Sequence, residues 1–311
     1  MTKSNGHQDF AIRACSLTKR FGRQVAVNQL DLSIRRGTTF GLLGPNGAGK
    51  SSTIRMLVGL TRIDSGTVEL LGHDVKRRTP QLKRRIGYVP ELHHLYGWMT
   101  VQEIIQFVST FYGTWDAGLC DQLLSLFELP PDKKVKSLSK GMTAKLGLLL
   151  ALAHRPELLI LDEPTSGLDP LAREEFLDGV LRAGGQTDQT VLFSSHQVDD
   201  VERIADEIGI MAQGRLVIHQ SVDSVRNDVK RIRAVLQDGS LPQHVPPETM
   251  WQAINRREWT LTVYPFRQGT LDDVVRNNPV VNAEVIDISL EDIFKDVVRG
   301  QKEGAARGPT T

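Results

Sequence analysis

Cysteine is scarce in this sequence. The 311 residues contain only two cysteines, Cys15 and Cys120, and these stand far apart in the chain. Disulfide frameworks and structural zinc sites require several cysteines, or cysteines with histidines, at characteristic spacings. We therefore expect neither kind of site, and the composition is typical of a protein from a reducing cytosol.

Long hydrophobic runs and an excess of one charge are also missing. No apolar run approaches the roughly 18–20 residues that span a bilayer, and we expect the longest candidates, 146–153 and 158–161, in a buried core. The beginning of the chain lacks the apolar segment of a signal peptide. The formal net charge of +1 disfavours a general binder of nucleic acid or membrane surfaces. We expect a cytoplasmic protein that reaches a membrane only through a partner, and no nucleic acid partner.

The rest of the composition is that of a globular protein, with 40% hydrophobic and 24% charged residues. Residues 10–220 alternate short apolar strands with helical patterns, which predicts an α/β domain around a largely buried sheet. The pattern of predicted elements changes after residue 220. The pattern over residues 221–302 predicts a small C-terminal α+β domain. We expect disordered tails at residues 1–9 and 303–311.

Apolar spacing predicts the individual elements. In the first domain, strands are expected at 10–17, 39–44, 85–90, 157–164, 190–196 and 207–217, and helices at 49–60, 100–112, 118–129, 139–154, 170–184 and 197–208. In the second domain, strands are expected at 230–237, 257–265 and 280–289, a helix at 270–278 and a proline-rich loop at 241–248.

A glycine-rich segment, GPNGAGKS at 44–51, matches the pattern G-x-x-x-x-G-K-[ST]. An apolar strand precedes it and a helical pattern follows, so that backbone N–H groups and a helix N-terminus can surround a phosphate. Lys50 is expected to reach the β- and γ-phosphates of a nucleoside triphosphate, and the Ser51 hydroxyl to bind Mg²⁺. The alternative is a tight turn with no ligand. The expected nucleotide contacts are Gly44, Pro45, Asn46, Gly47, Ala48, Gly49, Lys50, Ser51 and Ser52.

A second segment, LLILDEP at 158–164, ends an apolar strand on two carboxylates. Buried carboxylates are costly unless they face a metal or water. We expect Asp162 to hold Mg²⁺ and Glu163 to orient or deprotonate the attacking water. A strand end with two solvated acids is the alternative.

A third segment, SLSKGMTAKLGLLLALAH, lies directly before that strand. Ser139 stands at a predicted helix start and Gly141 just inside the helix. A hydroxyl and free amides at a helix N-terminus can bind an anion, although Ser139 can equally be an ordinary N-cap.

The order of these segments resembles that of the ATP-binding cassette (ABC) ATPase family over about residues 10–220. GPNGAGKS resembles the Walker A loop, and LLILDE resembles Walker B. LSKGM (138–142) is similar to the ABC signature, SGLD (166–169) to the D-loop, and Ser195–His196 to the switch-histidine motif. The resemblance implies a phosphate-loop cassette with a mixed sheet core and a helical subdomain, which binds ATP and Mg²⁺.

The resemblance also implies how further residues act. Two cassettes pair head to tail, so the signature of one caps the ATP bound to the Walker A loop of the other. His196 would contact the γ-phosphate and hold the attacking water with Glu163, unless it is a satisfied core histidine. Phe21 would stack on adenine, unless it is a core aromatic. The nucleotide contacts implied for the signature and the D-loop are Ser139, Lys140, Gly141, Met142 and Asp169.

Two positions depart from the common family pattern. Lys140 replaces the first glycine of the signature, and Glu91 replaces the usual glutamine after IGYVP. Glu91 keeps an oxygen for Mg²⁺ but adds negative charge at an anionic site. Both departures resemble a branch of exporter ATPases whose permease is a separate chain. That branch often has a C-terminal domain that ends much like SLEDIFKDVV (289–298).

The resulting hypothesis is an ATP-hydrolysing subunit of an ABC exporter at the cytoplasmic face of the membrane. Its partners would be a second cassette, from the same or a related chain, and a polytopic permease. The alternative is a soluble ABC ATPase that acts on ribosomes, nucleic acid or another protein. A degenerate cassette is disfavoured because Lys50, Asp162, Glu163 and His196 are all present.

Two surface segments have open interpretations. The segment YGWMTVQEIIQFVSTFYG (96–113) has more aromatic and apolar residues than one buried helix face requires, and we expect it either to dock the permease or to be a plain packed helix. Basic triplets at 76–78 and 83–85 are either a solvated helix face or a contact with anionic lipid.

Overall fold

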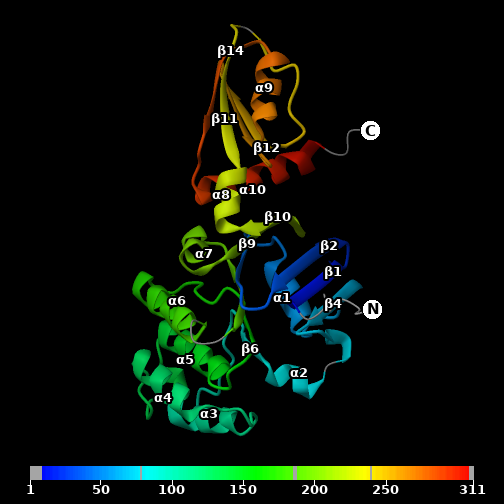
Figure 1. Ribbon diagram of the computed structural model, residues 1–311. Coiled ribbons are helices and arrows are strands. Elements are labelled where there is room, and N and C mark those ends of the chain that lie inside the picture. The colour runs from blue at the N-terminus through cyan, green and yellow to red at the C-terminus, as the bar shows by residue number, and fades with distance from the viewer. Residues whose placement is uncertain (1–8, 78, 185–187, 239, 308–311) are drawn as a thin grey trace, which may run out of the picture. The chain divides into compact units, whose positions relative to one another are not determined.

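The computed structural model describes residues 9–77, 79–184, 188–238 and 240–307 (Figure 1). The chain divides into two compact units, with the boundary between Leu216 and Val217. The disordered tail expected at residues 1–9 lies outside the described residues, except for Asp9. No helix within the described ranges is long and apolar enough to cross a membrane.

The first unit contains an antiparallel sheet with the strand order β2-β1-β4-β5. In its register Ala14 pairs with Leu32 on one side and with Val68 on the other. Only the first part of β1 was predicted from the sequence, and the other three strands were not. The strands are β1 (Phe10–Phe21), β2 (Gln24–Arg35), β4 (Ser65–Leu70) and β5 (His73–Asp74).

The second sheet of this unit has the order β10-β9-β3-β8-β7-β6. Strand β8 lies between β3 and β7, and all the pairs among β9, β3, β8, β7 and β6 are parallel. Every residue of β7 and β8 is buried, as expected for a parallel sheet covered on both faces. The strands are β3 (Thr39–Leu43), β6 (Ile86–Val89), β7 (Leu158–Leu161), β8 (Thr190–Ser195), β9 (Glu207–Ala212) and β10 (Arg215–Ser221).

Parallel strands bring their carboxyl ends to one edge of the sheet, so the residues after β3, β7 and β8 come together. Helix α5 lies between other elements: it contacts α3 and α4, and it also contacts α6 and the sheet strand β6. The helices are α1 (Lys50–Leu57), α2 (Pro80–Arg84), α3 (Val101–Ser109), α4 (Ala117–Leu126), α5 (Lys140–Leu152), α6 (Pro170–Gly184) and α7 (Val198–Ile204).

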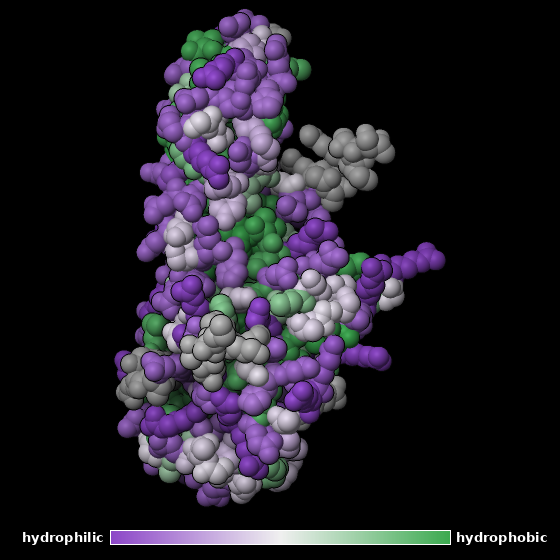
Figure 2. Space-filling model, turned by 45° about the vertical axis from the view of Figure 1, so that its right-hand side comes forward, coloured by the Kyte–Doolittle hydropathy of each residue, from purple (hydrophilic) through white to green (hydrophobic). Residues whose placement is uncertain are grey.

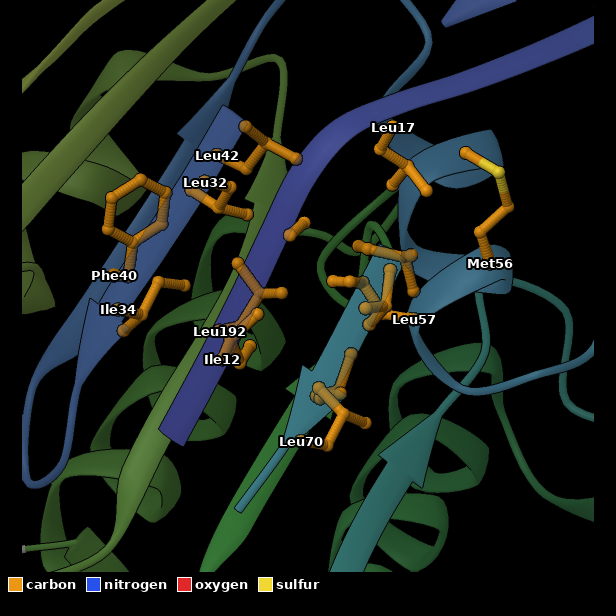
Figure 3. Close-up of a cluster of buried hydrophobic side chains, with 14 of the residues drawn as sticks. Ile12, Leu17, Leu32, Ile34, Phe40, Leu42, Met56, Leu57, Leu70 and Leu192 are labelled. Atoms are coloured by element: carbon orange, nitrogen blue, oxygen red, sulfur yellow. The ribbon is translucent and has the colours of Figure 1, made fainter. Parts of the chain in front are cut away.

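The core of this unit joins its two sheets and α1 (Figure 3). Side chains from the antiparallel sheet pack against side chains from β3, β8 and α1, so the segment after β3 is anchored on both sides. The buried residues labelled in Figure 3 are Ile12, Leu17, Leu32, Ile34, Phe40, Leu42, Met56, Leu57, Leu70 and Leu192.

Two predicted elements of this unit extend into the next element of the structure. The single strand expected at 207–217 is two strands, because Gln213 and Gly214 have positive φ angles and form a turn between β9 and β10. The helix expected at 197–208 ends at Ile204, where the chain turns into β9.

The second unit contains a four-stranded antiparallel sheet with the order β12-β13-β11-β14. One face carries the core, in which Ile232 and Ala234 pack with Trp259, Leu261 and Val274. Strand β12 and helices α8 and α10 were not predicted from the sequence, and β14 ends three residues earlier than expected. The elements are α8 (Val222–Asp228), β11 (Lys230–Leu236), β12 (Thr249–Asn255), β13 (Glu258–Val263), α9 (Gln268–Arg276), β14 (Val280–Ile286) and α10 (Leu290–Arg307).

Helix α10 is tied to the other face of this sheet by a buried carboxylate. Asp296 accepts hydrogen bonds from Arg231 Nη2 and Thr262 Oγ1, each at 2.6 Å. The disordered tail expected from residue 303 is wrong for 303–307, because α10 continues to Arg307. Residues 301–307, QKEGAAR, contain mostly good helix formers, so nothing ends the helix earlier. Residues 308–311 lie outside the described part of the chain.

Candidate functional site

The glycine-rich loop lies between β3 and α1, and its shape requires glycine at two positions. Gly49 has a φ of 106°, and a Cβ atom there would clash with the carbonyl oxygen of Ala26. A Cβ atom at Gly44 would lie 2.6 Å from the carbonyl oxygen of Met211. The loop therefore follows a path that only a bare backbone can take at these points, directly before the N-terminus of α1.

Lys50 is the first residue of α1, and its ammonium group is buried at the centre of the site. The Nζ atom donates hydrogen bonds to the carbonyl oxygens of Gly44 at 2.6 Å and Pro45 at 3.2 Å. It also lies 2.9 Å from Oε1 of Glu163. A buried ammonium needs such partners, and here they hold it inside the loop.

Asp162 follows β7 and is fully buried. Its Oδ1 atom accepts hydrogen bonds from the hydroxyls of Ser51 at 2.8 Å and Ser194 at 3.2 Å. Burial raises the pKa of Asp162, while these two hydroxyls lower it. Its Oδ2 atom is buried and lacks a partner within the described residues. A buried carboxylate oxygen without a hydrogen-bond partner, close to the Ser51 hydroxyl, fits a Mg²⁺ site.

Glu163 has an unusual backbone conformation, and both of its carboxylate oxygens have a partner. Its φ of 48° is left-handed, a conformation that costs a non-glycine residue about 1–3 kcal/mol. The hydroxyl of Ser194 accepts a hydrogen bond from the Glu163 backbone N–H at 2.9 Å. Oε1 contacts Lys50, and Oε2 lies 2.8 Å from Nδ1 of His196. This backbone places the carboxylate between the ammonium and the imidazole.

Lys50, Ser51, Glu163 and His196 border a cavity of about 430 Å³, whereas the buried Asp162 does not line it. The cavity brings together predicted residues from β1, the glycine-rich loop, the segment after β6 and the ends of β7 and β8. The predicted residues that line it are Phe21, Asn46, Gly47, Ala48, Gly49, Lys50, Ser51, Ser52, Glu91, Glu163 and His196; Gln24, Ala26 and Ser166 line it as well.

Two of these side chains could have been ordinary core residues, and the structure places both at the surface of the cavity. The ring of Phe21 is 54% exposed, and Lys19 Nζ lies 5.3 Å from the ring centroid. His196 is half-buried and contacts Glu163. Both residues are therefore available to a ligand in the cavity.

The signature residues do not line this cavity. Ser139 is the N-cap of α5, and its Oγ atom accepts the backbone N–H of Met142 at 3.1 Å. Lys140 is exposed, with its ammonium group close to Gly167. Asp169 lies just before α6, where its Oδ1 atom accepts the N–H of Ala172 at 2.9 Å. Within one chain these side chains are separate from the residues that surround Lys50.

Sequence reasoning missed two residues that position the site. Ser194 bonds both Asp162 and the backbone of Glu163. Asp200, buried on α7, accepts hydrogen bonds from Thr165 at 2.8 Å and Ser195 at 3.0 Å, and it pairs with Arg173. It therefore links the segments that carry Glu163 and His196 to α6. In the sequence, Asp200 stands out only as an acidic residue at a position of α7 where the spacing predicts an apolar one. Many solvent-exposed helices have such a residue.

The strand, glycine-rich loop and helix, with a buried lysine and a carboxylate oxygen that lacks a partner, match the pattern of a phosphate-loop protein. Comparisons with known proteins give the family. A family model described as "ABC transporter" matches residues 27–166. The chain belongs to the family of ABC transporter ATP-binding subunits.

Individual relatives support this assignment. The chain is 32% identical over 301 residues to the bacitracin transport ATP-binding protein BcrA of Bacillus licheniformis, covering 93% of this chain and 97% of that protein. It is 38% identical over 221 residues to the Nod factor export ATP-binding protein I of Cupriavidus metallidurans, covering 67% and 72%. A solved ATP-binding subunit of an ABC transporter has a TM-score of 0.63 and 28% identity, and covers 70% of this chain and 92% of its own.

Proposed function

We propose that this chain is the ATP-hydrolysing subunit of an ABC exporter whose permease is a separate polypeptide. The observation that supports hydrolysis is the contact series from Lys50 through Glu163 to His196 in a cavity bordered by the glycine-rich loop. The export direction is supported by relatives named for bacitracin transport and Nod factor export. The subunit would work at the cytoplasmic face of the membrane.

Several residues in and beside the cavity would have roles in ATP hydrolysis. Lys50 and the loop amides bind the phosphates, and the ring of Phe21 offers a stacking surface for adenine. Glu163 accepts the proton of the attacking water, and His196 keeps the carboxylate and the water aligned. Ser51 and Asp162 would hold Mg²⁺, with Glu91 as a further oxygen ligand. Bound Mg²⁺ would neutralise charge that develops on the β- and γ-phosphates.

The active form would be a head-to-tail dimer of cassettes. The N-terminus of α5 lies outside the cavity, yet it combines the Ser139 hydroxyl, free amides and the exposed cation of Lys140. Such a surface suits an anion, and the γ-phosphate of a nucleotide held by a second cassette is the anion that this arrangement would meet. Gly141, Met142 and Asp169 would border the same composite site.

Glu91 should make nucleotide binding depend strongly on the metal. Its carboxylate lines the cavity. Burial is the main cause of the raised pKa of Asp162, and the charge of Glu91 acts in the same direction. Without metal this charge repels the phosphates, and with metal it attracts the cation. We expect Glu91→Gln to bind Mn²⁺ about tenfold more weakly in the nucleotide complex, and to bind ATP more tightly in EDTA.

Electron paramagnetic resonance of Mn²⁺ and equilibrium ATP titrations measure these two quantities without turnover. Glu291→Gln, which removes an exposed charge on α10, is the matched control. If both affinities of Glu91→Gln equal those of the control, the carboxylate does not face the metal.

The segment after Glu91 offers an apolar surface for the permease. Tyr96, Trp98, Phe107 and Phe111 are all exposed, with Trp98 at 66%. Their rings touch in series, with centroid distances of 6.1 Å between Tyr96 and Trp98, 5.8 Å between Tyr96 and Phe107, and 5.1 Å between Phe107 and Phe111. Much of the surface visible in Figure 2 is hydrophilic, and a cluster of exposed aromatic rings is unusual for a surface that stays in water.

We expect Trp98→Ala combined with Phe107→Ala to reduce permease recovery in a pull-down about tenfold or more, because both rings anchor the contact. The measurement is the ratio of the two proteins in mild-detergent membranes, with thermal unfolding to show an intact fold. Leu181→Ala removes an exposed apolar side chain from α6 and serves as the control. Unchanged permease recovery would show that the cluster does not dock the permease.

The same pull-down with the wild-type chain tests the proposed function. A polytopic membrane protein recovered in stoichiometric amount supports the exporter. Recovery only from the soluble fraction, with ribosomes or nucleic acid, would instead support a soluble ABC ATPase, and the ATPase chemistry would remain.

A further inference from the structure

A row of unpaired lysines precedes helix α5. Residues 133–140 contain four lysines and no acidic residue. Lys133, Lys134 and Lys136, which we call the lysine row, are all exposed. None of the three has a carboxylate partner among the residues that the structure describes, whereas several other lysines of the chain do. Three ammonium groups are therefore free to meet an anionic partner.

The backbone holds the lysine row beside the segment that carries the exposed aromatic rings. The N–H of Lys136 donates to the carbonyl oxygen of Gly97 at 3.1 Å. Lys134 forms an isolated antiparallel bridge with Thr100. The lysine row thus runs antiparallel to the chain that leads into α3, and its position relative to the rings is fixed by the fold.

Lys136 begins directly next to two of the rings. Gly97 stands between Tyr96 and Trp98, and a Cβ atom added at Gly97 would lie 3.2 Å from Cβ of Lys136. The glycine therefore leaves room for the start of the lysine side chain. Both rings are exposed, so an ammonium group on a flexible stem and two amphipathic rings lie side by side.

The residue types favour a lipid surface as the partner of the lysine row. The row contains lysine and no arginine. Protein interfaces are enriched in arginine, whose planar guanidinium pairs with carboxylates in a fixed geometry, and they are depleted in lysine. Lysine-rich segments are attracted to anionic lipids without a fixed geometry. Tyrosine and tryptophan are the rings that gather at the headgroup level of a membrane.

Local charge determines this attraction, although the net charge of the chain is only +1. The Debye length is about 8 Å at physiological ionic strength, so distant acidic residues are screened. The paired segments 97–103 and 131–140 contain two acids, Asp132 and Glu103, and the Glu103 carboxylate accepts the backbone N–H of Thr100 at 2.7 Å. The same segments contain four lysines, so this surface is positive.

We propose that the lysine row binds anionic phospholipid headgroups of the bilayer around the permease. The proposal rests on the proposed function, because docking of the aromatic rings on the permease would bring the lysine row to the membrane surface. The contact needs no nucleotide and weakens with salt. It would hold the subunit at the membrane beside the permease.

Sedimentation of the full chain with vesicles, without permease, tests the lipid contact. The chain should bind vesicles of equal parts phosphatidylglycerol and phosphatidylcholine more tightly than vesicles of phosphatidylcholine alone, and high salt should remove the difference. Lys133→Gln, Lys134→Gln and Lys136→Gln combined should weaken binding to the anionic vesicles at least about tenfold, since three lysines at an anionic surface contribute up to about 100-fold.

A second triple variant is the matched control. Arg77→Gln, Lys83→Gln and Arg84→Gln together remove three exposed cations from residues 76–85, and this variant should bind anionic vesicles as the wild type does. Both triple variants keep side chains of similar length, and thermal unfolding checks that each is folded. Equal loss of binding in the two variants would show that net charge, and not the lysine row, attracts the lipid.

Three further outcomes would overturn the proposal. The first is equal binding of the wild-type chain to anionic and neutral vesicles. The second is a lysine-row variant that binds anionic vesicles as the wild type does. The third is a variant of this second kind that also loses the permease in the pull-down, which would make an acidic segment of the permease the partner. Wild-type permease recovery and ATP turnover test the proposed function separately, so its failure and the failure of the lipid contact are distinguishable.

Discussion

Glu163→Gln is expected to reduce ATP turnover by at least about 100-fold, because general base catalysis contributes roughly that much or more. Glutamine has the size of glutamate, and its carbonyl oxygen can still accept from Lys50, whose Nζ atom lies 2.9 Å from Oε1 in the wild type. It can also keep a contact with His196. The amide cannot take a proton from water, so binding should survive while the chemical step is lost.

The measurement is phosphate release at saturating ATP, together with the oligomeric state of the ATP-bound protein. A cassette that binds ATP but cannot hydrolyse it should accumulate as an ATP-bound dimer. Glu291→Gln removes a carboxylate far from the phosphate loop in sequence, in the C-terminal unit, and should retain full turnover. Normal phosphate release from Glu163→Gln would refute the role of Glu163 as the base.

The parts of the site that follow the chain locally could be predicted from the sequence. The glycine-rich loop, Lys50 and Ser51 are adjacent, and the helix that they begin is visible in the apolar spacing. Asp162 and Glu163 end a strand that is buried throughout, and buried strands are readable as short apolar runs. The approach of these two segments then follows from one rule, that parallel strands share an edge for their carboxyl ends.

The parts that depend on distant pairing could not be predicted. Strand β2 pairs with β1. Its residues alternate irregularly between buried and exposed, so its sequence shows no regular strand pattern. Asp200 has its role because β8, α6 and the segment after β7 meet around it. Ser194 looks like any strand serine until Asp162 and Glu163 are placed beside it. These contacts form only when the sheet is assembled. They join residues that are far apart in the sequence, so no local sequence pattern predicts them.

The aromatic segment is an intermediate case. The sequence showed more aromatic residues than one buried face needs, and the structure confirms that the rings of Trp98 and Phe107 are exposed. Whether a permease covers them stays a prediction, because an exposed surface alone does not identify its partner.

Lys50→Ala is expected to weaken ATP binding about 10- to 100-fold, because a charge-assisted hydrogen bond to phosphate contributes roughly 1.5–3 kcal/mol. The substitution also leaves the buried carboxylate of Glu163 without its ammonium partner, which adds repulsion toward the phosphates. Equilibrium titration with a fluorescent ATP analogue measures the affinity. Lys133→Ala, at an exposed position, is the control and should bind as the wild type does.

The two contributions can be separated with Lys50→Ala combined with Glu163→Gln. The glutamine removes the unpaired charge, so the weakening that remains relative to Glu163→Gln alone measures the contact between Lys50 and the phosphates. Thermal unfolding of each variant shows whether the loop still folds, since Lys50 also bonds the carbonyl groups of Gly44 and Pro45. If the double variant binds ATP as tightly as Glu163→Gln, Lys50 does not contact the phosphates. The assignment of residues 44–51 as the phosphate loop would then have to be abandoned, whatever the family resemblance.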